Sequence, residues 1–441
     1  MPSLTSETFN HYVERFLGMR LPDRLADLVP FSKLTPDAKG VALRLIELMK
    51  RSGCAATEFN AQMAWLLAAV TPSMLPAAWG DRIPPLTAPG RHRKLDTYVN
   101  HLIRPTDNGR PRLIDLGCGF PPVTAVDTAK FLPDWSVCGV DRTFHRYVLY
   151  DADGRYACFN RDGVFQYVQS PGKPLDDTPE AVRARFQSLF ADLRPLLGTP
   201  RDGRSASVDK DGGRLIADHV RDFERENLTF VKADIDALQL PPARIVRCMN
   251  MLLYFSKDDR ERMLTAMGAL LDENGFMMTG FNHPFGIYAR YAVYARDAAG
   301  IRPREFAFSM DNLQPLGIGP WLTLVEDDRE AALLADLTAA IRADRTFWSD
   351  FTRRVDALRA QFEIGRRDPD GFLQFTEETR TATPLVVTQK TTALWQQMAA
   401  EGYAGGAVAA LGRAGYQAWI NAVGDIAVLP PEQSLDTVRE G

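Results

Sequence analysis

Short apolar runs that end on polar residues recur through the middle of the chain, separated by turns or helical patterns. The runs are 112–116, 137–141, 228–234 and 276–281, with a further one beginning at Ala243. Nearly continuous apolar runs are typical of parallel strands that are buried on both faces, and their alternation with helices is typical of an open α/β sheet. A helical pattern over 257–271 precedes the last run. The chain is therefore predicted to have an α/β fold around a parallel sheet.

Glycines and acids stand where the first two runs end. The first run leads into the turn Asp115-Leu-Gly117-Cys-Gly119, and the second ends on Asp141. Gly117 and Gly119 let the backbone approach a ligand where a Cβ would collide. Because the carboxyl ends of parallel strands meet at one edge of a sheet, Asp141 lies where a carboxylate can accept hydrogen bonds from both hydroxyls of a ribose. The order of these residues predicts a nucleotide-type cofactor.

The glycine spacing separates two kinds of cofactor. A dinucleotide site requires G-x-G-x-x-G, whereas Phe120, Pro121 and Pro122 follow the second glycine here. The Asp-x-Gly-x-Gly pattern instead resembles motif I of the class I S-adenosylmethionine-dependent methyltransferases. This resemblance implies a Rossmann-like, seven-stranded methyltransferase sheet and S-adenosylmethionine as the cofactor. The residues that it implies as cofactor contacts are Asp115, Gly117 and Gly119 for the methionine end, Asp141 for the ribose, and Asp234 for the adenine amino group.

The segment from Arg247 to Phe255 resembles the block after the fourth strand in the chemotaxis-receptor glutamate methyltransferases. The likeness continues through the following leucine-containing helix and the Asn-Gly-Phe strand. Within this segment, Asn250 is expected to line the methyl-facing side of the cofactor. The exit of the fifth strand departs from that family, since it reads Gly280-Phe-Asn-His-Pro284. We therefore take only the core fold from this resemblance and expect no receptor substrate.

Helical patterns flank the core and interrupt it. Residues 1–95 are predicted to form a helical cap, in which Thr5 or Ser6 caps a first helix and Thr57-Glu58 opens a later one. The cofactor-binding core is assigned to 96–283 and 401–430, where a helix and an antiparallel hairpin close the sheet. Two insertions are expected, a β-meander with a helix over 142–227 and a mainly helical one over 284–400. The polar, glycine-rich stretch 198–213 is predicted to be a mobile loop.

Composition narrows the choice of partners. Hydrophobic residues make up 45% of the 441 residues, charged residues make up 24%, and the net charge of −4 gives no electrostatic reason to bind nucleic acid or an anionic membrane. No run approaches the ~18 apolar residues that a membrane span needs. The N-terminus shows no secretory signal, and five widely spaced cysteines without a C-x-x-C pair favour a cytoplasmic protein. Metal-ligand spacings are missing, so no metal is expected.

The acceptor side of the reaction offers two candidate residues. A methyl group on a sulfonium is already activated, so its in-line displacement needs alignment more than acid–base chemistry. His283 follows the fifth strand, where a structural hydrogen bond is its default role and removal of a proton from the acceptor is the catalytic alternative. Tyr254 is expected either beside the substrate or in the core at a helix start.

Three functions follow from these patterns. The leading one is methyl transfer from S-adenosylmethionine to a small or medium-sized acceptor enclosed by the cap and the insertions. The second is methylation of a protein side-chain carboxylate, in which the inserted meander binds a peptide by strand addition. The third is a non-catalytic regulatory or scaffold protein that binds the cofactor. No residue pattern specifies the acceptor or an oligomeric state.

Overall fold

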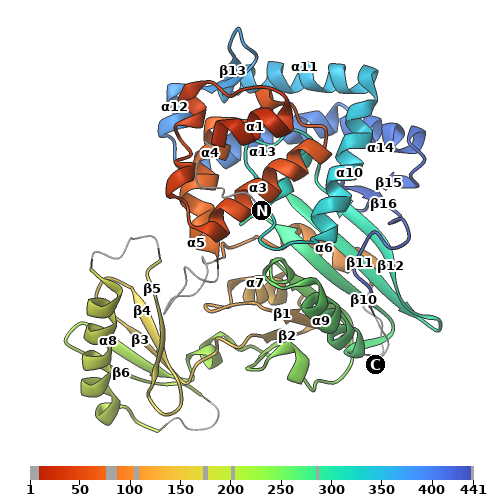
Figure 1. Cartoon of the computed structure of the whole chain (residues 1–441). Helices are drawn as coiled ribbons and strands as arrows, with labels where there is room; N and C mark the ends of the chain where they lie inside the picture. Colours follow the sequence, from red (N-terminus) through yellow and green to blue (C-terminus); the bar gives the residue numbers. More distant parts are fainter. Residues whose placement is uncertain are drawn as a thin grey trace.

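The computed structural model describes residues 9–75, 87–103, 109–171, 177–199, 204–284 and 288–438. A large mixed sheet lies at its centre with helices on both faces, and a smaller sheet projects from one side (Figure 1). The predicted capping of the first helix by Thr5 or Ser6 lies outside the described residues. The helix itself, α1, is described over Phe9–Leu17.

The central sheet joins five parallel strands to four antiparallel ones. In spatial order its strands are β8 (Leu228–Val231), β2 (Ser136–Val140), β1 (Arg112–Leu116), β9 (Ala243–Met249), β10 (Leu271–Asn282), β11 (Ala289–Asp297), β12 (Gly300–Phe308), β16 (Ile426–Val428) and β15 (Ala418–Ile420). Pairing is parallel from β8 to β10 and antiparallel beyond β10. The predicted α/β class is confirmed, whereas the predicted count of seven strands is wrong because the sheet has nine.

The two extra strands come from the segment 284–400, which was predicted to be mainly helical. This segment begins with β11 and β12, which extend the sheet from β10 before any helix starts. The terminal hairpin β15–β16 therefore adds to β12 instead of closing the sheet beside the parallel strands. The side chains of Tyr291 and Val293 pack on one face of β11 and those of Ala292 and Tyr294 on the other. Since both faces are buried, β11 lacks the polar alternation that identifies a half-exposed strand.

Helices cover the two faces of the sheet in separate groups. On one face lie α6 (Arg93–Leu102) and α7 (Val123–Phe131). On the other lie α9 (Lys257–Ala269), α10 (Arg329–Ala343), α11 (Arg345–Gln361), α13 (Pro384–Ala400) and α14 (Tyr403–Arg413). A short hairpin of β13 (Gly365–Arg367) and β14 (Leu373–Phe375), followed by α12 (Glu377–Thr381), comes between α11 and α13. The sheet core is thus closed on both sides.

The N-terminal helices form a separate cluster near the carboxyl ends of β9 and β10. After α1 they are α2 (Asp23–Ala26), α3 (Pro36–Arg51), α4 (Ala61–Trp65) and α5 (Thr71–Met74), with a π-helical turn at Leu66–Val70. Their apolar side chains pack against Leu253, Phe281 and Trp321. The prediction that Thr57-Glu58 opens α4 is wrong. These residues lie in a 3-10 turn (Ala56–Glu58), and the Asn60 side chain caps α4 by accepting hydrogen bonds from two backbone N–H groups.

The segment between β2 and β8 folds into the smaller sheet, seen at the lower left of Figure 1. Its strands, in spatial order, are β5 (Phe165–Gln169), β4 (Tyr156–Phe159), β3 (Tyr147–Tyr150), β7 (Gly213–Ala217) and β6 (Ala206–Lys210). Helix α8 (Pro179–Leu193) packs on one face. The prediction of a mobile loop over 198–213 is wrong for 206–213, which form the β6–β7 hairpin, while residues 200–203 lie outside the described ranges.

Helices that could span a membrane are absent from the described ranges, where none is both long and apolar enough. Each of the five cysteines is a buried free thiol. Three of them, Cys118, Cys138 and Cys248, pack in the core around the strands or the glycine turn, as the sequence predicted. There they act as small apolar side chains.

Candidate functional site

The parallel strands place their polar ends along one edge of the sheet. From β1 the chain proceeds outward in one direction to β2 and β8, and in the other direction to β9 and β10. The strand order therefore reverses between β1 and β9. In open α/β sheets, ligands bind in the crevice outside the carboxyl ends of the strands at such a point. The glycine turn that follows β1 lies at this position.

The glycine turn and Asp141 are joined directly. The backbone N–H of Gly119 donates to Asp141 Oδ2 at 2.7 Å, and the N–H of Gly117 donates to the Val140 carbonyl at 2.8 Å. Gly117 and Gly119 have φ of 72° and 71°, in the left-handed region that favours glycine. Asp141 Oδ1 accepts hydrogen bonds from the backbone and hydroxyl of Thr143. The carboxylate is thus fixed at the junction of β1, β2 and the turn.

Asp115 is placed differently from the other predicted cofactor residues. Its side chain is buried, and its Oδ1 accepts from Arg247 Nε at 2.9 Å. Arg247 also donates to Asp96 at 2.6 Å and to Thr128 at 2.8 Å. Burial lowers the pKa of Arg247, but the two carboxylates more than reverse this and hold the pKa above its ordinary value. Asp115 therefore supports the turn from within the core.

Asn250 lies at the end of β9 and is locked to the end of β10. Its Nδ2 donates to Asn282 Oδ1 at 2.7 Å, and its Oδ1 accepts from the Asn282 backbone N–H at 3.0 Å. Asn250 has a φ of 62°, which asparagine tolerates better than most residues. The next residue, Met251, turns back so that its side chain lies against Gly117. This segment therefore forms one wall beside the glycine turn.

Asp234 follows β8 at the far side of the same edge. It is exposed and begins a 3-10 turn at Ile235–Ala237. Between it and the glycine turn lies the end of β2, where the N–H of Asp141 donates to the Val231 carbonyl at 3.2 Å. Asp234 and Asp141 therefore lie on the β2–β8 side of the edge, and Asn250 lies on the β9–β10 side.

Arg91 and His92 are two site residues that the sequence analysis missed. The N–H of Gly90 donates to Asp127 on α7, and Arg91 donates through Nε and Nη2 to the Asn282 carbonyl. Asn282 Nδ2 donates in return to the Arg91 carbonyl at 2.9 Å. The segment therefore runs from α7 to the end of β10. The only sequence signal was the basic run Arg91-His-Arg-Lys94 before β1, which gave no indication of where it docks.

Arg91 is a half-buried cation that forms no ion pair with a carboxylate among the described residues. Its third nitrogen, Nη1, has only the Thr87 hydroxyl at 3.4 Å. Burial lowers the pKa of Arg91 to about 10. His92 is also buried, and neither ring nitrogen has a hydrogen-bond partner in the part of the chain that the structure describes. Burial, together with nearby Arg247 and Arg91, lowers the pKa of His92 well below its usual value, so the ring is neutral.

The two predicted acceptor-side residues, His283 and Tyr254, both lie within electrostatic range of Arg91. Burial, with a smaller effect of Arg91, lowers the pKa of His283 to about 4. The ring of His283 meets that of Tyr288 edge-on at 6.0 Å, and its backbone N–H donates to the Tyr288 carbonyl. Burial raises the pKa of Tyr254 and Arg91 partly opposes this. At neutral pH His283 is therefore an uncharged ring, and its low pKa makes it a weak base.

The smaller sheet contacts the turn through aromatic side chains. Tyr156 donates its hydroxyl to the carbonyl of Phe120 at 2.9 Å, directly after the glycine turn. The ring of Phe120 meets those of Tyr156, His219 and Phe223 edge-on. The inserted segment is thus attached beside the β2 end of the site, while the N-terminal helices pack near the β10 end.

Comparisons with known proteins give only distant structural likenesses. No model of a known protein family matches the chain, and no curated protein matches its sequence. Among solved structures, one similar chain is the apo form of the S-adenosylmethionine-dependent methyltransferase SibL, at 14% identity and a TM-score of 0.20 over 43% of this chain and 36% of that one. Another is magnesium protoporphyrin IX methyltransferase from Synechocystis with bound S-adenosylhomocysteine, at 13% identity and a TM-score of 0.21 over 43% and 55%.

A third is an O-methyltransferase family 2 protein from Planctomyces limnophilus in complex with apigenin, at 15% identity and a TM-score of 0.20 over 54% of this chain and 46% of that one. The chain thus spans less than two thirds of the length of each of these three structures. TM-scores near 0.2 carry no weight for function, so the assignment rests on the geometry of the site itself.

Proposed function

We propose that this protein binds S-adenosylmethionine at the carboxyl ends of β1, β2, β9 and β10 and transfers its methyl group to a small or medium-sized acceptor. The observation that carries the proposal is the glycine turn bonded to Asp141 where the strand order reverses. A dinucleotide is disfavoured because its G-x-G-x-x-G motif requires a third glycine. Here Pro121 and Pro122 occupy that part of the turn.

The residues at this edge suit the cofactor in three respects. A Cβ placed on Gly119 would meet nothing within 4 Å, which leaves the backbone accessible to a ligand. Asp141 is held in position to accept from ribose hydroxyls, and Asp234 is exposed near the expected adenine end. Arg91, which forms no ion pair among the described residues, supplies a cation for the amino-acid carboxylate. The one adjustment needed is at Gly117, where the flexible Met251 side chain has to move aside.

Bound at this edge, the cofactor supplies a methyl group on a positively charged sulfur. Asn250 and Asn282, fixed by two mutual hydrogen bonds, would form a rigid wall on the methyl-facing side. Neutral His283 would accept a hydrogen bond from the acceptor, or its proton where the acceptor is itself acidic, and Tyr254 would line the acceptor side. The N-terminal helices contribute to the enclosure because they pack against Leu253 and Phe281, next to the ends of β9 and β10. This enclosure favours a small acceptor.

Protein carboxylate methylation is the second candidate, and one observation favours it. The smaller sheet has two edges, β5 and β6, and most of β6 is exposed. An exposed edge can bind an extended peptide by strand addition. The third candidate is cofactor binding without catalysis. It agrees with the same turn geometry and differs from the two enzymatic candidates only in that no methyl group is transferred.

The proposal is tested by calorimetric titration of S-adenosylmethionine and S-adenosylhomocysteine into wild type and Asp141→Ala. The matched control is Asp134→Ala, because Asp134 is exposed and lies just before the start of β2. We expect micromolar binding that Asp141→Ala abolishes and Asp134→Ala leaves intact. Absence of binding to folded wild type would contradict the proposal. Binding without methyl transfer to any screened small acceptor or peptide would favour the non-catalytic function.

A further inference from the structure

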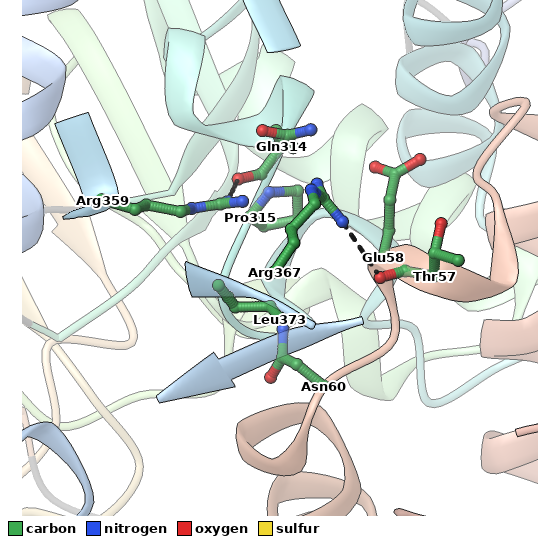
Figure 2. Close-up of a pocket in the computed structure, with 8 residues that line it drawn as sticks. All are labelled: Thr57, Glu58, Asn60, Gln314, Pro315, Arg359, Arg367 and Leu373. Atoms are coloured by element: carbon green, nitrogen blue, oxygen red, sulfur yellow. Dashed lines mark hydrogen bonds between the residues drawn. The ribbon is translucent and has the colours of Figure 1, made fainter. Parts of the chain in front are cut away.

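Arg359, one of several buried arginines, lines a polar pocket between the N-terminal helices and the β13–β14 hairpin. The pocket is lined by Thr57, Glu58, Asn60, Gln314, Pro315, Arg359, Arg367 and Leu373 (Figure 2). Arg359 comes from α11 and Arg367 from β13, and their guanidinium groups approach Pro315 in the view of Figure 2. Segments that are distant in sequence therefore converge on one small polar space.

The charges around this pocket do not balance. Arg342 is matched by Glu58, to which both of its terminal nitrogens donate. Arg359 and Arg367 share a single carboxylate, Asp356. Arg367 Nε donates to it at 2.6 Å, whereas Arg359 Nη1 lies 3.4 Å from it. Three arginines thus face two carboxylates, which leaves one positive charge in excess.

Of the two arginines that share Asp356, Arg359 is the more deeply buried and carries the excess positive charge. Only 3% of Arg359 is exposed, and its Nη2 donates to the neutral carbonyl of Gln314 at 2.8 Å. Burial lowers the pKa of Arg359 to about 10, and neighbouring Arg367 contributes in the same direction. A buried charge without a full counterion is costly, so the arrangement is incomplete as it stands.

The side chain of Gln314 gives independent evidence of a missing partner. Gln314 is 2% exposed and lines the pocket, and its Oε1 has no hydrogen-bond partner among the described residues. Exchanging the amide oxygen and nitrogen by rotation of the side-chain amide would turn an N–H donor to the space that Oε1 now faces. With that orientation, Gln314 and the two arginines would all offer donors.

We propose that this pocket binds a small monatomic anion, chloride under ordinary conditions. The space holds about one water molecule, so chloride, which is somewhat larger, fits after small side-chain shifts, whereas a phosphate group is far too large. The anion would neutralise the charge shared by Arg359 and Arg367. It would also link the 3-10 turn before α4 to the β13–β14 hairpin, whose connecting residue Phe372 packs with the N-terminal helices. The site is therefore structural and independent of the methyl-transfer site.

The test is thermal unfolding at constant ionic strength, with sodium chloride replacing sodium gluconate. Above the dissociation constant, the melting temperature of wild type should rise by about 1–3 °C for each tenfold increase in chloride. Arg359→Met should remove this dependence. The control is Arg353→Met, an exposed arginine on the same helix, which should keep it. A chloride dependence that is absent from wild type, or equal in the two variants, would overturn the proposal.

A crystallographic measurement on wild type covers the case in which the Arg359 variant does not fold. Crystals grown in bromide should show an anomalous peak between the guanidinium groups of Arg359 and Arg367. Density for water alone at that position would refute the anion site. A second pair of variants, Arg367→Gln and the exposed neighbour Arg366→Gln, repeats the comparison on the hairpin, and only the first should weaken the chloride effect.

Discussion

The sulfur of Met251 lies 1.6 Å from the point where a Cβ on Gly117 would stand. Gly117 therefore makes room for a protein side chain as well as for a close ligand. Gly119 differs, because a Cβ there would meet nothing within 4 Å, although its φ of 71° nearly equals the 72° of Gly117. Substitutions at the two glycines therefore distinguish the free-energy cost of a left-handed backbone from the cost of a steric clash with Met251.

Gly119→Ala should lower the free energy of unfolding by about 1–2 kcal/mol, the cost of a left-handed conformation for an L-residue. Gly117→Ala should cost more, about 2–4 kcal/mol, because Met251 must also be displaced. Urea denaturation of both variants measures the difference. Adding Met251→Ala to each should bring the two costs together, and a gap that persists in the double variants would show that Met251 is not its cause.

Arg91 should contribute strongly to cofactor affinity through its charge. Hydrogen bonds to charged groups are worth about 1.5–3 kcal/mol, so Arg91→Gln should weaken S-adenosylhomocysteine binding about 10–100-fold. Arg93→Gln is the matched control, because Arg93 is exposed two residues further along and lies over the Phe131 ring. Calorimetry on the two variants decides the point. Equal affinities would mean that Arg91 only holds Asn282 in place.

The buried ion cluster around Arg247 should govern stability. Removing one partner of a buried ion pair typically costs about 3–5 kcal/mol, so Arg247→Met should destabilise the protein by roughly that amount. Arg244→Met on the same strand should cost under about 1 kcal/mol, since Arg244 is half-buried and donates to a backbone carbonyl near the surface. Chemical denaturation measures both. A small effect of Arg247→Met would indicate that Asp115 and Asp96 are satisfied without it.

Local patterns were sufficient to predict that the glycine turn and Asp141 lie together. The apolar runs of β1 and β2, the glycine turn and Asp141 lie close in sequence, so their spacing alone placed them together. Asp115 was expected to touch the cofactor because it begins the glycine motif. Its bond to Arg247 was not predicted, since Arg247 is 132 residues away and no short-range pattern links the two. Arg91 was missed for the same reason, since its position depends on docking against Asn282, 191 residues further along the chain.

Two strands were not predicted because they lack the alternation of apolar and polar residues that identifies a strand. One of them is buried on both faces, and the other is largely exposed. In β11 both faces are covered, and the run from Tyr291 to Ala295 has no charged residue, so the segment did not show a period of two. In β6 three of the five residues are exposed and polar, so the hairpin resembled a loop. Backbone hydrogen bonds hold β6 to β7, and because they do not depend on the side chains, the amino-acid composition does not reveal them.

Glu330 should make stability depend on pH in the neutral range. Glu330 is half-buried, and its carboxylate accepts a hydrogen bond from the Thr279 hydroxyl at 2.8 Å and lines a cavity with Arg290 and Tyr294. Burial, followed by the charge of Asp328, raises the pKa of Glu330 from 4.5 to about 7. The folded state therefore binds a proton that the unfolded state releases between these values. Stability should consequently fall as pH rises from 4.5 to 7, by about 3 kcal/mol from this group.

Glu330→Gln keeps the hydrogen-bonding shape without the titration. It should be more stable than wild type at pH 8 and equal to it near pH 4, whereas Glu326→Gln, an exposed acid four residues earlier, should follow wild type throughout. Other groups near the cavity, including Asp328, Asp436 and Arg290, are present in wild type and in Glu330→Gln alike. Their contributions to the pH dependence therefore cancel when the two curves are compared. Urea denaturation at half-unit pH steps measures the curves. If the Glu330→Gln curve runs parallel to wild type, the carboxyl stays ionised in the fold, and the neighbouring arginines must neutralise it.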